Sequence, residues 1–291
     1  MTSELLNREA GAEVFFKCEN LQKAGAFKSR GACNAVFSLS AAEAQSGVVT
    51  HSSGNHAAAL ARAAKLRGIP AHIVMPSNSP KPKQRAVEGY GGRIVFCEPT
   101  LEARERACAA LLAETGGTLV HPYNDLRIVT GQATAALELL EQAADLDAVL
   151  APLGGGGLLS GTSVALKLLR PVTRVFGAEP AQADDGAESF RAGRIVTRPV
   201  NTVADGLRTM LGDVTFPIIR HYTDDILTVS EAGIVHAMRR IWEIAKLVVE
   251  PSGAVPFAAV LEHSTLFAGK RVGVILSGGN VDLDTLPWIN R

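Results

Sequence analysis

The sequence is poor in cysteine, and the cysteines present show no pattern of a structural site. Cys18, Cys33, Cys97 and Cys108 form no C-x-x-C pair and lie in apolar or helix-like surroundings. This spacing argues against both a disulfide framework and a zinc site. We therefore expect free, buried thiols.

A net charge is also lacking, because 29 basic residues balance 29 acidic ones. Without a field of one sign, neither nucleic acid nor an anionic membrane surface is a favoured partner. No run approaches the roughly eighteen apolar residues of a membrane span, and the N-terminal segment has early acids and no apolar signal core. We expect a cytoplasmic protein that binds a small molecule.

The chain has 291 residues, of which 47% are hydrophobic and 20% charged, so it can bury a sizeable core. Apolar runs bounded by glycine or proline alternate with helical patterns, which is typical of an α/β fold with parallel strands and crossover helices. We predict strands over residues 14–18, 47–50, 71–75, 94–97, 119–121, 148–153, 174–178 and 272–277. We predict helices over residues 57–66, 81–90, 101–115 and 158–170.

Residues 47–124 show a regular strand-helix rhythm, which predicts a small sheet covered by three helices. We interpret this segment as a small domain inserted into a large domain that comprises residues 1–46 and 125–291. No shift in composition marks the two boundaries.

Four successive glycines form the clearest local motif, and they stand between an apolar strand and a helix. Because they lack Cβ atoms, their N–H groups can converge on an anion such as phosphate at the positive end of the helix. The run fits neither a dinucleotide fingerprint nor a Walker loop, and a plain flexible turn is the alternative. The glycines are Gly154, Gly155, Gly156 and Gly157.

A second polar loop, H-S-S-G-N-H at residues 51–56, also stands between a strand and a helix. Its amides and hydroxyls can hold a carboxylate. The alternative is a helix N-cap formed by Ser53 or Asn55.

Lys28 follows Phe27 near an expected helix start, and Ser277 ends a buried strand before two glycines. Most lysines are surface cations, but a Schiff-base lysine needs a partly desolvated amine to attack a carbonyl near neutral pH. Ligands of open α/β sheets bind beyond the carboxyl ends of strands. Ser277 therefore either contacts a ring nitrogen or forms a simple turn.

Together these segments resemble the fold-type II pyridoxal-phosphate (PLP) enzymes, whose two-domain fold is tryptophan synthase β-like. Within them they resemble the group of serine racemases, serine/threonine dehydratases and 3-hydroxyaspartate dehydratases. The likeness covers residues 14–284 and is carried by A-F-K-S-R-G-A at 26–32, S-S-G-N-H at 52–56, the four glycines and S-G-G-N at 277–280.

The resemblance implies a role for each motif. Lys28, next to Phe27, is the Schiff-base lysine, and the four glycines hold the cofactor phosphate. Asn55 faces the ring hydroxyl, and Ser277 faces the pyridine nitrogen. The segment 47–124 is a mobile domain whose closure excludes water, and the protein is a homodimer.

The same resemblance implies how the substrate is bound. The α-carboxylate is gripped at Ser52, Gly54, Asn55 and His56. Ser53 faces the substrate from the side opposite the lysine, a placement that permits two-base chemistry.

Residues 179–185, E-P-A-Q-A-D-D, resemble the cation site of the racemase-like branch. The implied ligands are Glu179, the carbonyl of Ala183 and Asp185. Hard oxygen ligands suit Mg²⁺ or Ca²⁺, and Mn²⁺ is also compatible. An exposed acidic turn is the alternative.

Arg104 resembles, by its place in the sequence, an arginine of the racemase-like branch that can approach the distal carboxylate of a dicarboxylic ligand. The planar guanidinium suits this role. The alternative is a charged neighbour on a helix surface. Tyr123 departs from the pattern, because the racemase branch tends to have asparagine at this place near the hinge.

The resemblance implies a PLP-dependent ammonia-lyase that converts L-serine, L-threonine or 3-hydroxyaspartate to a keto acid, with racemisation as a side reaction. A dedicated serine- or aspartate-type racemase is the alternative. A PLP-binding protein without catalytic activity is a third hypothesis, which the presence of Lys28 and Ser53 disfavours.

Overall fold

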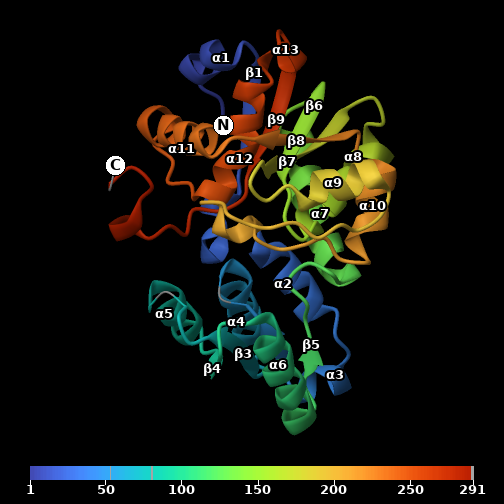
Figure 1. Cartoon of the computed structure of the whole chain (residues 1–291). Coiled ribbons are helices and arrows are strands. Elements are labelled where there is room, and N and C mark those ends of the chain that lie inside the picture. The colour runs from blue at the N-terminus through green and yellow to red at the C-terminus, as the bar shows by residue number, and fades with distance from the viewer. Residues whose placement is uncertain (53, 80, 290–291) are drawn as a thin grey trace.

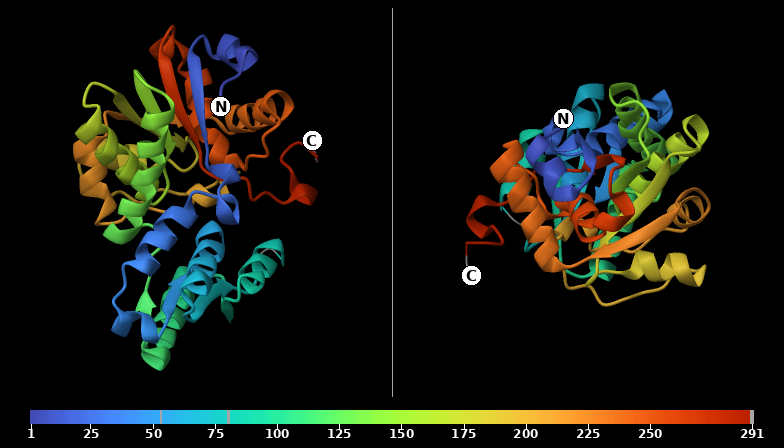
Figure 2. Two further views of the ribbon diagram at one scale, coloured as in Figure 1. Left: turned by 180° about the vertical axis from the view of Figure 1, so that it is seen from behind. Right: turned by 90° about the horizontal axis from the view of Figure 1, so that it is seen from above.

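The computed structural model describes residues 1–52, 54–79 and 81–289, and the chain forms two lobes that are each built on a parallel sheet (Figure 1). The view from behind in Figure 2 shows helix α2 (Lys28–Phe37) running from one lobe towards the other. No helix among these residues is long and apolar enough to cross a membrane.

The large lobe contains a five-stranded sheet in the order β1-β9-β6-β7-β8, and all its strand pairs are parallel. Its strands are β1 (Glu13–Cys18), β6 (Ala148–Pro152), β7 (Arg174–Pro180), β8 (Asp225–Val229) and β9 (Arg271–Leu276).

Helices cover both faces of this sheet, which explains why its strands are apolar on both sides. Ala148 and Leu150 of β6 pack on one face with α1, α11 and α12, whereas Val149 and Ala151 pack on the other with α7, α8 and α10. The helices of this lobe are α1 (Glu4–Ala10), α7 (Leu126–Gln142), α8 (Gly157–Leu169), α9 (Asp185–Ala192), α10 (Thr215–Tyr222), α11 (Glu231–Arg240), α12 (Pro251–Glu262) and α13 (Ser264–Phe267).

The small lobe contains a parallel sheet in the order β4-β3-β2-β5. Its strands are β2 (Val48–His51), β3 (Ala71–Pro76), β4 (Arg93–Cys97) and β5 (Thr118–Leu119), and its helices are α3 (Ala41–Gln45), α4 (Asn55–Arg67), α5 (Lys81–Gly89) and α6 (Leu101–Thr115). α4 and α5 cover one face and α6 covers the other.

The core of the small lobe also takes apolar side chains from outside the segment 47–124. Ala32, Ala35 and Val36 of α2 pack against α4, and Ala44 of α3 joins the same cluster. Helix α2 therefore connects the two lobes by packing. The core of the small lobe includes residues that precede the predicted boundary at residue 47.

Local chemistry sets the ends of the helices at the seam between the lobes. α4 begins after Gly54 and ends before Gly68, which caps the helix with a φ of 75° that glycine readily adopts. α12 begins at Pro251, which suits the first helical position because its missing N–H would be unpaired there.

The predicted α/β class with parallel strands is confirmed. The predicted strands are present with shifted ends, and the strand expected over 119–121 is Thr118–Leu119. No strand was predicted for β8, and no helix was predicted for α7, α11 or α12. None of the four cysteines forms a disulfide, and Cys108 is buried while the other three are half-buried.

Candidate functional site

The segments that follow β1, β6 and β9 meet the end of β2 and the start of α4 around a cavity of about 340 Å³. The carboxyl ends of parallel strands share one edge of a sheet, so motifs far apart in the sequence converge there. The cavity is lined by all the predicted cofactor- and substrate-binding residues that the structure describes: Phe27, Lys28, Ser52, Gly54, Asn55, His56, Arg104, Gly154, Gly155, Gly156, Gly157 and Ser277. Ser53 lies outside the described residues.

Lys28 is the first residue of α2, and its amine lies inside the site. Its Nζ donates a hydrogen bond to the Pro122 carbonyl at 2.7 Å and lies 4.9 Å from the centre of the Phe27 ring. The side chain as a whole borders the cavity and is half-buried, but the protein around Nζ removes it from water and lowers the pKa of Lys28 to about 8. Among the described residues, no carboxylate forms an ion pair with it.

The start of α2 is held, two residues beyond Lys28, by an ion-pair network in which Lys17, Glu19 and Arg30 are largely buried and Glu138 is partly exposed. Arg30 donates to Glu19 at 2.7 Å through Nε and to Glu138 at 2.6 Å through Nη2. Lys17 donates to the same Glu138 oxygen at 2.6 Å. These bonds lower the pKa of Glu138 to about 2, so the network stays charged at neutral pH and fixes the helix that carries Lys28.

The four glycines link the end of β6 to the start of α8, where unpaired helix N–H groups face the cavity. Gly156 has φ of 90°, and a Cβ there would come within 2.7 Å of Ile219. A Cβ on Gly155 would overlap the Tyr123 ring. Larger residues are therefore excluded, and the loop fits a phosphate group.

His56 lies in α4 and is buried. Its Nε2 is 3.1 Å from the Val120 carbonyl, and burial lowers the pKa of His56 to about 3. The neutral side chain thus makes its polar contact with the Val120 carbonyl. Its backbone N–H, in the first turn of α4, is the group left to bind a carboxylate.

Three further aromatic rings stand beside the site. The His121 ring packs edge-on against His51 at 5.8 Å and against Tyr123 at 4.6 Å between centroids. His121 Nδ1 accepts the Asn124 backbone N–H at 2.9 Å. Burial, followed by the charges of His51 and Lys28, lowers the pKa of His121 to about 4, so His121 is neutral at physiological pH.

The predicted cation ligands lie near the end of β7 and the start of α9, away from the cavity lining. Glu179 accepts the N–H groups of Gly186 at 3.0 Å and Ala187 at 2.8 Å. Burial raises the pKa of Glu179 to about 9 and that of Asp185 to about 6. One Asp185 carboxyl oxygen has no hydrogen-bond partner among the described residues.

Two buried acids that have no cationic partner among the described residues fit an oxygen-coordinated cation, which would favour their charged forms. Ala183, the third predicted ligand, lies between Glu179 and Asp185 in the sequence. It is buried, and its backbone carbonyl is the predicted ligand atom. No cluster of three or more His, Cys, Asp or Glu side chains suited to a metal occurs in the part of the chain that the structure describes.

Arg104 lines the same cavity as Lys28 from helix α6. Its Nε donates only a long hydrogen bond, 3.4 Å, to the Thr100 carbonyl of its own helix. Burial, followed by the charge of Arg104, lowers the pKa of His51, so the guanidinium acts on the cavity as well as on solvent.

Several cavity residues were missed in the sequence. Lys83 and Asp205 form an ion pair of 2.5 Å, and among the described residues it is the one ion pair that joins strands or helices of residues 48–119 to the large lobe. Glu250 accepts a hydrogen bond from Asn55 at 2.8 Å. An acid directly before Pro251, after the apolar pair of residues 248–249, was the available signal for Glu250. Nothing local pointed to Lys83 or Asp205.

Comparisons with known proteins agree with this geometry. Residues 1–278 match the family model described as "Pyridoxal-phosphate dependent enzyme". The chain is 55% identical over 288 residues to the beta-hydroxyaspartate dehydratase of Paracoccus denitrificans, with 99% of this chain and 91% of the relative covered. It is 54% identical over 292 residues to the serine racemase of Arabidopsis thaliana, with 98% and 88% covered.

Solved structures give the same result. The structure of maize serine racemase superposes with a TM-score of 0.96 at 49% identity, and the match covers 98% of this chain and 89% of that chain. Both the sequence and the fold are therefore shared with enzymes of one family. This chain belongs to the family of pyridoxal-phosphate dependent enzymes.

Proposed function

We propose that this enzyme converts a small hydroxy amino acid, namely L-serine, L-threonine or 3-hydroxyaspartate, to a keto acid and ammonia, with racemisation as a side reaction. The observation that carries the proposal is the desolvated amine of Lys28, which shares one cavity with the glycine loop and the start of α4. The relatives that bear the names beta-hydroxyaspartate dehydratase and serine racemase support the substrate class.

The cavity offers a partner for each part of the cofactor. The N–H groups of the glycine loop would hold the phosphate, Asn55 would face the ring hydroxyl and Ser277 the pyridine nitrogen. When bound, PLP withdraws electrons from the substrate α-carbon and so makes its proton removable. A hydroxyl partner such as Ser277 leaves the ring nitrogen largely unprotonated, which favours elimination over transamination.

Residues of both lobes handle the substrate. Ser52, Gly54, Asn55 and His56 bind its α-carboxylate through the N-terminus of α4, whose partial positive charge suits an anion. Lys28 would hold PLP covalently and, with its amine free, would remove the α-proton. The β-hydroxyl would take up one proton and leave as water, and a water added later would release ammonia, so the amino acid becomes keto acid plus ammonia.

Racemisation is a branch of the same pathway. If Ser53 returns a proton to the α-carbon from the face opposite Lys28, the product is the other enantiomer. A dedicated racemase is therefore the second candidate, and the serine racemase relatives favour it. Closure of the segment 47–124, a homodimer and a cytoplasmic location belong to the same proposal.

Substrate turnover tests the function directly. With PLP and a panel of L-serine, L-threonine, D-serine and 3-hydroxyaspartate, the protein should form keto acid faster than it exchanges enantiomers. Keto acid is measured by reduction with a coupled dehydrogenase, and enantiomers by chiral chromatography. Enantiomer exchange with negligible keto acid from every member of the panel would make the enzyme a racemase.

The Lys28→Ala variant is the control for that assay. It should lose turnover and the borohydride-reducible link to PLP, because one residue supplies both the covalent link and the base. Lys23→Ala, which changes an exposed lysine of the preceding segment, should behave as the wild type. A reducible link that persists in Lys28→Ala would contradict the assignment.

A divalent cation should stabilise the protein at the Glu179–Asp185 site. In chelator, stability should fall as pH rises from about 4 through 6 towards 9, because both carboxyls have raised pKa values in the fold and their charged forms are penalised. Mg²⁺ or Ca²⁺ should therefore raise Tm more at pH 8 than at pH 5, and 100 times Kd of free cation supplies about 2.7 kcal/mol.

The control for the cation site is a matched acid on the same helix. Asp185→Ala should lose the response to the cation, whereas Glu188→Gln, which changes an acid paired with Arg191 at the surface, should keep it. An identical Tm in chelator and in cation at pH 8 would count against the site.

Arg104 should decide the preference among substrates. If its guanidinium pairs with a distal carboxylate, kcat/KM should be highest for 3-hydroxyaspartate. Arg104→Ala should lower that value roughly tenfold to a hundredfold, since a charge-assisted pair contributes about 1.5 to 3 kcal/mol. Activity on L-serine should change little, and Arg106→Ala, on the exposed side of α6, should affect neither substrate. Equal losses on both substrates would make Arg104 a structural residue.

A further inference from the structure

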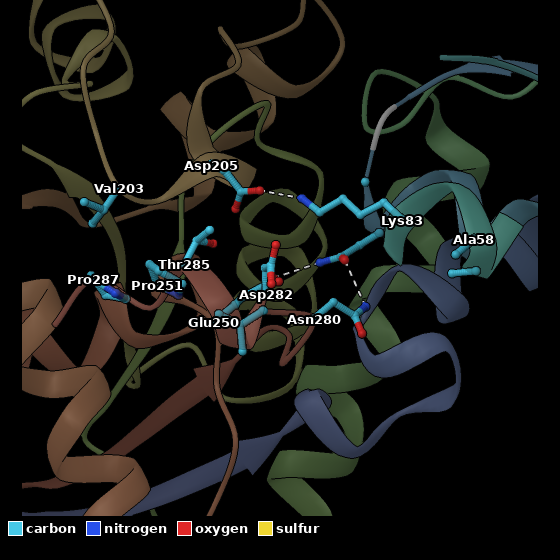
Figure 3. Close-up of a pocket in the computed structure, with 14 residues that line it drawn as sticks. Ala58, Lys83, Val203, Asp205, Glu250, Pro251, Asn280, Asp282, Thr285 and Pro287 are labelled. Carbon is cyan, nitrogen blue, oxygen red and sulfur yellow. Dashed lines mark hydrogen bonds and ion pairs between the residues drawn. The ribbon is translucent and has the colours of Figure 1, made fainter. Parts of the chain in front are cut away.

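Three polar side chains from different segments of the chain meet beside the cofactor cavity, and we call them the Asn55 cluster: Asn55, Glu250 and Asn280. Figure 3 labels two of them, Glu250 and Asn280. Asn55 begins α4 of the small lobe, Glu250 precedes α12, and Asn280 follows β9. Asn55 Nδ2 donates to Glu250 Oε1 at 2.8 Å, and Asn280 Nδ2 donates to Asn55 Oδ1 at 3.0 Å. The cluster therefore joins the small lobe to two loops of the large lobe.

The chain around the cluster decides which way the Asn55 amide points. Asn280 Nδ2 also donates to the Ala24 carbonyl at 2.7 Å, so this nitrogen must face both Ala24 and Asn55. Asn55 must therefore accept this hydrogen bond through its Oδ1, so its Nδ2 is the atom that donates to Glu250. A flipped Asn55 would set two NH₂ groups against each other.

Glycines leave the space that the cluster needs. A Cβ on Gly278 would lie 2.5 Å from Glu250 Oε1 and 3.1 Å from Asn55 Nδ2, and a Cβ on Gly25 would overlap the Asn280 side chain. Gly279 also donates its N–H to the Gly25 carbonyl at 3.0 Å, in the loop that leads to Lys28. The S-G-G-N motif is thus needed beyond Ser277, because its glycines and asparagine build the support of Asn55.

Glu250 is buried at the partition between two cavities. It lines the cofactor cavity and also a neighbouring cavity of about 540 Å³, and Asn55, Lys83 and Asp205 line both. Burial, followed by the negative charge of Asp205, raises the pKa of Glu250 to about 7, while Lys83 and the bonds from Asn55 and Asn280 lower it. Its acceptor oxygen is available to Asn55 in either protonation state.

We propose that Glu250 and Asn280 are positioning residues that fix the side-chain amide of Asn55 against the cofactor ring. The inference rests on the proposed contact between Asn55 and the ring hydroxyl. Asn55 Nδ2 carries two hydrogens, and one of them is donated to Glu250 in a hydrogen bond. The second is then held in a direction set by the cluster instead of rotating freely, which lowers the entropy lost when the cofactor binds.

The test compares removal of the acceptor with its conservative replacement. Glu250→Ala and Asn280→Ala should each weaken PLP binding to the apoprotein roughly tenfold, the scale of one lost hydrogen bond in a buried site. Binding is measured by titration of protein fluorescence. Glu250→Gln retains an acceptor oxygen for Asn55, so it should restore PLP affinity to within about threefold of the wild type.

Two further readouts separate positioning from a structural role. In the loaded enzyme, the alanine variants should lower kcat more than they raise KM, because Glu250 and Asn280 act on the side-chain amide of Asn55, whereas the α-carboxylate is bound by the N-terminus of α4. Their apoprotein Tm should stay close to that of Asp282→Asn, a control that removes an acid from the neighbouring cavity and none from the cluster. Asn280 is exposed, so Asn280→Ala should fold even if Glu250→Ala does not.

Three results would overturn the proposal. The first is that both single variants, Asn280→Ala and Glu250→Ala, bind PLP as tightly as the wild type. The second is Glu250→Gln binding PLP as weakly as Glu250→Ala. The third is a fall in apoprotein Tm that accounts for the whole loss of affinity. PLP titration does not depend on the substrate, so a wild type that makes no keto acid would end the proposed function and leave this inference standing.

Discussion

Removal of the Lys28 amine from water is the constraint on which the rest of the site depends. A free lysine is neutral in about one molecule of three thousand at pH 7, whereas a pKa of about 8 makes roughly one in ten neutral. The neighbouring groups preserve this effect. Nζ has the Pro122 carbonyl as its hydrogen-bond acceptor, His56 and His121 are held neutral, and no described carboxylate pairs with the amine. Because the charged form is disfavoured in the fold, this lysine lowers stability below about pH 8, and the penalty disappears as pH rises towards 10.5.

α2 is anchored by charged residues two positions beyond Lys28. Arg30 forms bidentate contacts with Glu19 and Glu138, so the charges that the site cannot tolerate near Lys28 are gathered on the other side of the same helix. The apolar face of α2 meanwhile packs into the core of the small lobe. One helix therefore carries the reactive amine, its electrostatic anchor and the link between the lobes, which couples the position of Lys28 to the position of α4 and its loop.

The α/β class, the motifs at the carboxyl ends of strands and their meeting in one cavity could all be predicted from the sequence. Such motifs follow from local chemistry, since glycine runs and apolar strands determine their own backbone. β8 could not, because D-I-L-T-V is short and its three apolar residues are interrupted by Thr228. The Asn55–Glu250 bond and the Lys83–Asp205 pair join residues 195 and 122 positions apart, and no spacing rule relates them. Contacts of this kind between the two lobes are recognised only when the lobes are placed together in the structure.

The rate at which the apoprotein forms its covalent link with PLP, measured against pH, tests the account at its centre. The reactive species is the neutral amine, so the rate should rise with pH and level off with a midpoint near pH 8. Glu19→Gln and Glu138→Gln, which act on the anchor of α2, should alter the plateau and leave the midpoint in place. A midpoint near 10.5 would show that the amine is solvated as an ordinary lysine is, and it would contradict the central role given to its desolvation.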